Sequence, residues 1–209
     1  MEDYRTIRGT ATGEYEEKKS RFIAQLSFAD SEEKAVAFLE QVRAANRTAR
    51  HNVYAYRLRE GNRERYSDDG EPAKTAGTPA LEVLQHSGLT DLVVVITRYF
   101  GGVLLGTGGL VRAYSGAVKE GIAASKIGTM RYGVRLKICT DYNGIGKIQY
   151  ILRQNGLEAE DTVYTDQVEL TVLLAAECVP GLKKEITEAT AAKAGIEEVE
   201  KLYFVAPDA

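Results

Sequence analysis

Two stretches of this sequence combine residue types that could hold or transform a charged ligand. The first, residues 98–117, reads RYFGGVLLGTGGLVRAYSGA; five of its first twelve residues are glycine, and it follows the apolar run DLVVVIT. A strand, a glycine-rich turn and a helix in this order bring backbone N–H groups and a helix N-terminus together, which attracts anions. The candidate contacts with such an anion are Arg98, Gly106, Gly108, Gly109 and Arg112.

The glycine-rich stretch matches neither of two common nucleotide-binding loops. The Rossmann pattern G-x-G-x-x-G breaks at Val111, and no acidic residue suited to a ribose follows about 20 positions later. The Walker pattern requires Gly-Lys-Ser or Gly-Lys-Thr, and neither occurs here. Gly116 and Gly121 lie inside the expected helix, where they indicate close packing against a neighbouring element. Anion binding and packing both remain open.

The second stretch is the acidic turn YSDDGEPAKTAGTP at residues 66–79. Asp68, Asp69 and Glu71 form a carboxylate cluster that a hydrolase or a magnesium site could use, with His51 as the base or further ligand. The alternative is structural: Asp-Asp-Gly builds an Asx turn, and Glu71 caps the next helix or pairs with an arginine.

A third feature is local positive charge. Residues 43–65 contain seven arginines and two acids, in a chain whose net charge is −3. Arginine recognises phosphate through a bidentate fork, so this segment is a candidate contact with RNA phosphate or with an acidic partner. A solvated surface held by salt bridges is the alternative. The candidates from this segment and from the acidic turn are Arg50, His51, Arg57 and Lys74.

Composition limits the class of protein. A net charge of −3 over 209 residues argues against a protein that coats nucleic acid. No apolar run is long enough for a membrane helix, and the polar N-terminus lacks a secretory core, so we expect a cytoplasmic location. Cys139 and Cys178 stand alone and are expected to be buried, unreactive thiols. His51 and His86 are the only histidines, and no grouping has metal-ligand spacing. We expect neither a metal nor a cofactor.

Hydrophobic periodicity predicts two domains, at residues 1–127 and 128–209. In the first, a capping box at Asp30 and Glu33 begins a helix, and the polar segment 61–79 is a long loop. The strands expected there are 4–12, 20–28, 51–59 and 91–98, with helices at 31–45, 78–87 and 107–125. In the second, the expected order is strand 131–140, helix 143–156, strands 157–165 and 167–175, helix 180–195 and strand 197–206. This βαββαβ order is that of the ferredoxin-like fold.

Four blocks of the first domain, taken in order, resemble the YigZ/IMPACT family. They are KKSRFIA (18–24), HNVYAYR (51–57), DDGEPAKTAGTPAL (68–81) and RYFGGVLLGTGGLVRAYS (98–115). The resemblance implies an α/β (α+β) protein, whose N-terminal domain has the superfold of the second domain of ribosomal protein S-five and of the GHMP kinases. It also implies a C-terminal ferredoxin-like domain similar to domains of elongation factor G. At Lys74 the family usually has glycine.

The resemblance also implies a role. Eukaryotic members regulate translation by competing for a partner of a starvation kinase, so they are binding proteins rather than enzymes. The leading hypothesis is a translation-associated binding protein whose N-terminal domain contacts RNA, the ribosome or a translation-regulatory protein. One alternative is a nucleotide-binding or hydrolytic enzyme that uses the acidic turn beside the glycine-rich loop. The other is a purely protein-binding adaptor.

Overall fold

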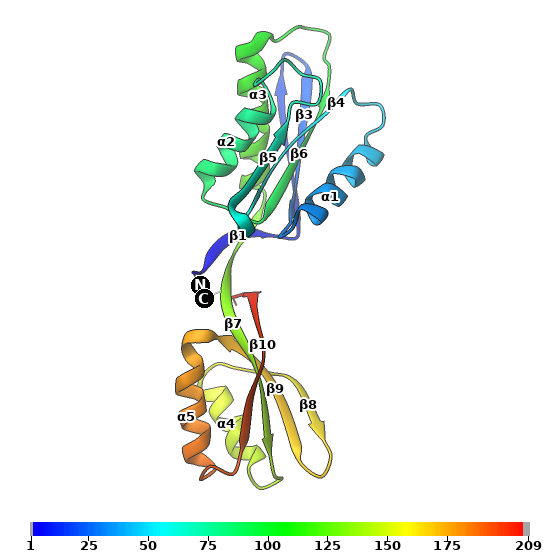
Figure 1. The fold of residues 1–209 in the computed structure, drawn as a ribbon. Coiled ribbons are helices and arrows are strands. Elements are labelled where there is room, and N and C mark those ends of the chain that lie inside the picture. The colour runs from blue at the N-terminus through cyan, green and yellow to red at the C-terminus, as the bar shows by residue number, and fades with distance from the viewer. Residues whose placement is uncertain (1, 207–209) are drawn as a thin grey trace. The chain divides into compact units, whose positions relative to one another are not determined.

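The computed structural model describes residues 2–206 and separates into two compact units (Figure 1). One unit is Tyr4–Thr129, and the other comprises the described residues from Met130 onward together with residues 2 and 3. The division falls inside strand β7, close to the domain limit expected from the sequence. Within the described part of the chain, no helix is both long and apolar enough to cross a lipid bilayer.

The larger unit is built on one antiparallel sheet of order β2-β3-β6-β4-β5. Its strands are β2 (Thr10–Glu17), β3 (Ser20–Phe28), β4 (His51–Leu58), β5 (Arg63–Ser67) and β6 (Leu92–Tyr99). The helices are α1 (Glu32–Ala45), α2 (Gly77–Ser87) and α3 (Gly106–Ala123), and the 3-10 turn η1 (Glu60–Asn62) precedes β5. Strand β1 (Tyr4–Arg8) joins the sheet of β7 instead.

Helices cover both faces of this sheet because its central strand, β6, is apolar on both sides. On one face, Val94 and Ile96 of β6 share a core with residues of α2 and α3 such as Leu84 and Tyr114. On the other face, Val93 and Val95 share a smaller core with α1. Figure 1 shows the resulting three layers.

Three sequence predictions for this unit are wrong. The single strand expected at 4–12 is broken at Gly9, whose φ of +67° ends β1. The segment 61–79 is not loop throughout, because residues 63–67 form the edge strand β5. The α1 cap is also displaced by one residue: Ser31, not Asp30, accepts a hydrogen bond from the Lys34 backbone N–H.

The smaller unit follows the predicted βαββαβ order. Its elements are β7 (Lys126–Thr140), α4 (Ile145–Gln154), β8 (Ala159–Tyr164), β9 (Val168–Ala175), the 3-10 turn η2 (Ala176–Cys178), α5 (Val179–Ala189) and β10 (Gly195–Val205). The antiparallel order β10-β7-β9-β8 is that of a ferredoxin-like sheet. Leu136 and Leu170 of the sheet share a core with Ile148 of α4 and Ile186 of α5.

The sequence predicted that both cysteines of this unit are buried, and this prediction is wrong. Cys178 is exposed, and Cys139 is half-buried. Burial and the nearby Glu169 carboxylate raise the pKa of the Cys139 thiol, which lowers its thiolate fraction. At about pH 8 we therefore expect iodoacetamide to alkylate Cys178 faster than Cys139. Mass spectrometry of Cys178→Ser should show the fast phase lost, and the opposite order of labelling would contradict this account.

Candidate functional site

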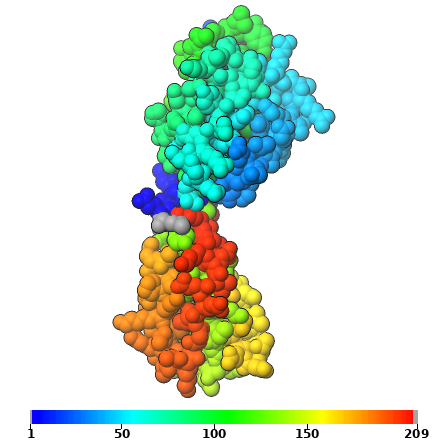
Figure 2. Space-filling model, in the orientation of Figure 1, coloured from blue at the N-terminus to red at the C-terminus, as the bar shows by residue number. Residues whose placement is uncertain are grey.

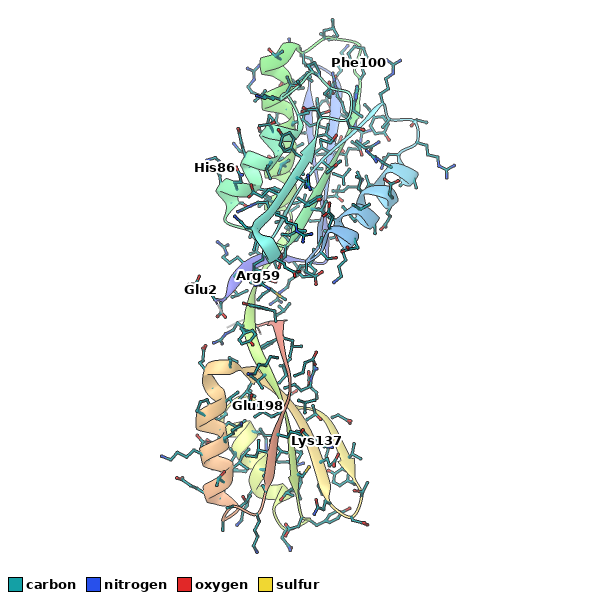
Figure 3. All side chains as sticks on the ribbon, viewed as in Figure 1. Glu2, Arg59, His86, Phe100, Lys137 and Glu198 are labelled. Carbon is teal, nitrogen blue, oxygen red and sulfur yellow. The ribbon has the colours of Figure 1, made fainter. Side chains whose placement is uncertain are left out.

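The candidate residues gather at one end of the sheet in the larger unit. Strand β6 ends there and β4 begins there, because His51 lies opposite Arg98 in the antiparallel register. Helices α2 and α3 also begin at this end, after the loops that leave β5 and β6. Figure 3 shows Phe100 at this end and Arg59 at the opposite end of the unit, and Figure 2 shows the segment after β6 at the surface there. We call this region the α3 end.

A pocket of about 450 Å³ opens at the α3 end. It is lined by Thr48, Arg50, His51, Arg98, Tyr99, Phe100 and Leu104. Three of these residues, Arg50, His51 and Arg98, were candidates from the sequence, and the fold brings them together although Arg50 and Arg98 are far apart in the chain. The pocket joins cationic side chains to exposed apolar ones.

Arg98 is buried beside the pocket and is held in place by Glu71. Its Nη1 donates to Glu71 Oε1 at 2.6 Å, and the two side chains are 9% and 3% exposed. Tyr114 of α3 donates its hydroxyl to the same oxygen at 2.8 Å. Burial raises the pKa of Tyr114, and the Glu71 charge raises it further, so this hydroxyl remains a donor. Glu71 thus pairs with an arginine, one of the structural roles that the sequence left open.

The two aspartates of the acidic turn also have internal partners. Asp68 accepts from the backbone N–H groups of Ala76 and Gly77 at 3.1 and 2.8 Å, and so caps the start of α2. Asp69 accepts from the backbone of Asn52 at 2.6 Å. Within residues 2–206, no three His, Cys, Asp or Glu side chains form a group that could hold a metal ion. Each carboxylate of the acidic turn therefore has a partner within the unit, and Glu71 holds Arg98 at the pocket.

His51 is oriented by the same turn. Its Nδ1 lies 2.8 Å from the carbonyl oxygen of Asp69. Because a carbonyl only accepts, Nδ1 must carry the hydrogen, which leaves Nε2 of a neutral ring with a free lone pair.

The remaining candidate cations differ in position. Arg50, Lys74 and Arg112 are exposed, and their side chains have no ion-pair partner among the described residues. Arg57 lies six residues along β4 from His51, or about 20 Å away. It pairs with Glu64 at 2.7 Å and donates to backbone carbonyls near the end of α2, so it is not brought to this site.

The glycines serve several purposes. Gly106 has a φ of +70° and begins α3, with Gly108 and Gly109 in its first turn. Gly101 lies so close to the backbone of Lys19 that a Cβ added at Gly101 would be 2.1 Å from the carbonyl carbon of Lys19. Within α3, a Cβ on Gly116 or Gly121 would clash with a side chain of β2 or β3, which confirms the packing role expected for these two residues.

Lys74, at the position where the family usually has glycine, adopts the left-handed conformation, with a φ of +64°. A lysine there carries a steric cost that glycine avoids, of about 1 kcal/mol after the greater chain entropy of glycine is counted. We expect Lys74→Gly to raise the free energy of unfolding by about that amount. Urea denaturation compared with Lys74→Ala, which keeps the strain, tests this; equal stability of the two variants would contradict it.

Sequence reasoning missed several residues of the site. Phe100 and Leu104 line the pocket and are 55% and 84% exposed, although both are large and apolar. Their presence in a glycine-rich loop was the available signal, because exposed apolar side chains beside charge often mark binding surfaces. Tyr114 carries the only hydroxyl in the buried face of α3, and a buried hydroxyl needs a partner.

Comparison with known proteins shows which families and relatives this chain resembles. The Impact N-terminal domain matches residues 18–122, and a domain of unknown function (DUF1949) matches residues 139–193. The IMPACT family member YvyE of Bacillus subtilis (strain 168) is 34% identical over 205 residues, which cover 98% of this chain and 94% of that protein. The IMPACT family member YigZ of Escherichia coli (strain K12) is 45% identical over 125 residues, covering 58% of this chain and 61% of YigZ.

A solved structure has a similar fold over nearly the whole chain. A crystal structure described only as that of a hypothetical protein is 33% identical, with a TM-score of 0.64 over 96% of this chain and 98% of that chain. The family matches therefore cover both units, and the pocket lies within the residues matched by the first of them. This chain belongs to the IMPACT family.

Proposed function

We propose that this protein is a translation-associated binding protein that contacts RNA through the α3 end of its larger unit. The observation that carries the proposal is the set of unpaired cations there. Exposed lysines and arginines lie on four separate segments at the α3 end, and none has an ion-pair partner within the described residues. They are Lys18, Lys19, Arg47, Arg50, Lys74 and Arg112.

These cations converge because each segment ends at the same end of the sheet. The β2–β3 turn carries Lys18 and Lys19 and lies against Gly101, and the segment between α1 and β4 carries Arg47 and Arg50. Glu16 and Glu17 on β2 offset part of this charge. A ligand with several phosphates matches such a surface, since each cation can neutralise one phosphate. The first turn of α3 adds N–H groups that favour the same negative charge.

The acidic turn supports binding rather than hydrolysis. Asp68 is occupied as a helix cap, and Glu71 is paired with Arg98. A general base or metal ligand must be free to reach a substrate. The family supports the translation context, because several relatives are eukaryotic IMPACT proteins, including the IMPACT homolog of Dictyostelium discoideum, 40% identical over 95 residues.

The test is RNA affinity as a function of salt. Fluorescence anisotropy with a labelled single-stranded RNA should give a negative slope of log K against log salt concentration. Arg50→Ala and Arg112→Ala should each weaken binding and reduce the magnitude of that slope by about 1. Arg5→Ala is the matched control: Arg5 is also exposed, but its backbone contacts Thr90 at the opposite end of the unit. Absence of RNA binding, or equal effects of all three variants, would refute the proposal.

A further inference from the structure

The pocket at Arg98 has a composition that a bare phosphate does not explain. Its volume of about 450 Å³ falls in the range of sites for small organic ligands, roughly 300–1,000 Å³. Arg50 supplies net positive charge and Arg98 supplies hydrogen-bond donors, whereas Phe100 and Leu104 supply apolar surface. A ligand that fits both must carry an anionic group next to a flat apolar body.

Arg98 has donors to spare for such a ligand. Among the described residues, only Nη1 has a hydrogen-bond partner, so Nη2 is the donor left for a ligand, whereas the unpaired Nε is enclosed by protein. The guanidinium lies over two aromatic rings, 5.5 Å from the centre of Phe22 and 5.8 Å from that of Phe100. It is therefore fixed before any ligand arrives. Because Glu71 neutralises its charge, Arg98 contributes oriented donors, and the exposed Arg50 contributes net charge.

Phe100 offers an aromatic surface on which the flat part of such a ligand can stack. Its ring lies over the guanidinium, yet the residue remains 55% exposed beside Leu104. An exposed aromatic ring next to an arginine is the usual platform on which a nucleic-acid base stacks.

His51 adds a means of recognising ribose. With Nδ1 donating to the Asp69 carbonyl, Nε2 of the neutral ring can only accept, and the residue lines the pocket. A ribose 2′-hydroxyl is a donor that DNA lacks.

We propose that this pocket receives one nucleotide of a bound single-stranded RNA. Its base stacks on Phe100 beside Leu104, its phosphate binds Arg50 and Arg98, and its 2′-hydroxyl donates to His51. This inference rests on the proposed function, since it assigns one subsite of the same RNA-binding surface.

Phe100→Ala tests the subsite with the labelled RNA used above. Loss of one stacked base should weaken binding by about 5- to 150-fold and leave the salt slope unchanged, because no charge is removed. Phe100→Trp should retain affinity. Val36→Ala is the control, since Val36 is a similarly exposed apolar residue on α1. His51→Ala should reduce the preference for RNA over the DNA of the same sequence.

The outcomes separate the two proposals. If Phe100→Ala binds like the wild-type protein while Arg50→Ala still reduces the salt slope, the nucleotide subsite is wrong and RNA binding stands. A reduced salt slope in a folded Phe100→Ala variant would also contradict the subsite, since the loss would then be of phosphate contacts. If the wild-type protein does not bind RNA, both proposals fail.

Discussion

Replacing Glu71 by alanine is expected to lower the free energy of unfolding of the larger unit by about 3–5 kcal/mol. Two buried groups lose their acceptor at once: the Arg98 guanidinium, which is 9% exposed, and the Tyr114 hydroxyl. An uncompensated charge in the interior is far more costly than the pair itself is stabilising. Urea denaturation followed by circular dichroism measures the change.

A control variant and a double-mutant cycle test whether the unpaired charge of Arg98 causes this loss of stability. Glu82→Ala removes an exposed carboxylate of α2 that has no ion pair among the described residues, so its effect should stay within about 0.5 kcal/mol. The double variant Glu71→Ala/Arg98→Ala should lose less stability than the two single variants added together, because the unpaired charge is gone. Strict additivity, or a loss below about 1 kcal/mol for Glu71→Ala, would contradict the account of this pair.

The second large effect is expected at Gly13 of β2. A Cβ at this position would lie 2.2 Å from the backbone nitrogen of Gly121, so α3 and β2 approach each other backbone to backbone. Because no side chain can rotate away, Gly13→Ala should separate the two elements and cost about 3 kcal/mol or more. The same urea experiment measures this loss.

Gly108→Ala is the control for this variant. Gly108 lies in α3, the helix that Gly13 packs against, but its Cβ would meet nothing nearer than the Arg112 side chain, at 3.9 Å. Alanine favours a helix over glycine by about 1 kcal/mol, so this variant should be neutral or slightly more stable. Equal stability of Gly13→Ala and the wild-type protein would show that helix and sheet are not packed this closely.

Periodicity identified most elements but not those whose residues are polar. The helix at 31–45 and the buried strand β6 were predictable because one has a clear 3.6-residue apolar repeat and the other is apolar throughout. Strand β5, with the sequence RERYS, has no such pattern; it forms because its backbone pairs with β4, and Glu64 binds Arg57 across that pair. Long-range pairing of this kind leaves no local signal.

The site could be predicted only in part, because residue types indicate candidates but not their long-range partners. Residue types marked Arg98, His51 and Arg50, and the fold brings these three to one pocket. The partner of Arg98 could not be deduced, since Glu71 is 27 residues away and equally suited to catalysis or capping. Arg57 shares their charge but lies at the other end of β4, because local charge density does not say which residues meet at one end of a sheet.

The central claim, that the α3 end binds RNA, is tested most directly by mapping the contact on the full chain. Titration of the ¹⁵N-labelled protein with single-stranded RNA should shift the backbone amide signals of residues 47–51 and 98–109. The signals of residues 57–63 and 88–91, at the opposite end of the same unit, should stay in place. Shifts confined to the opposite end or to residues 130–206, or no shifts at all, would contradict the claim.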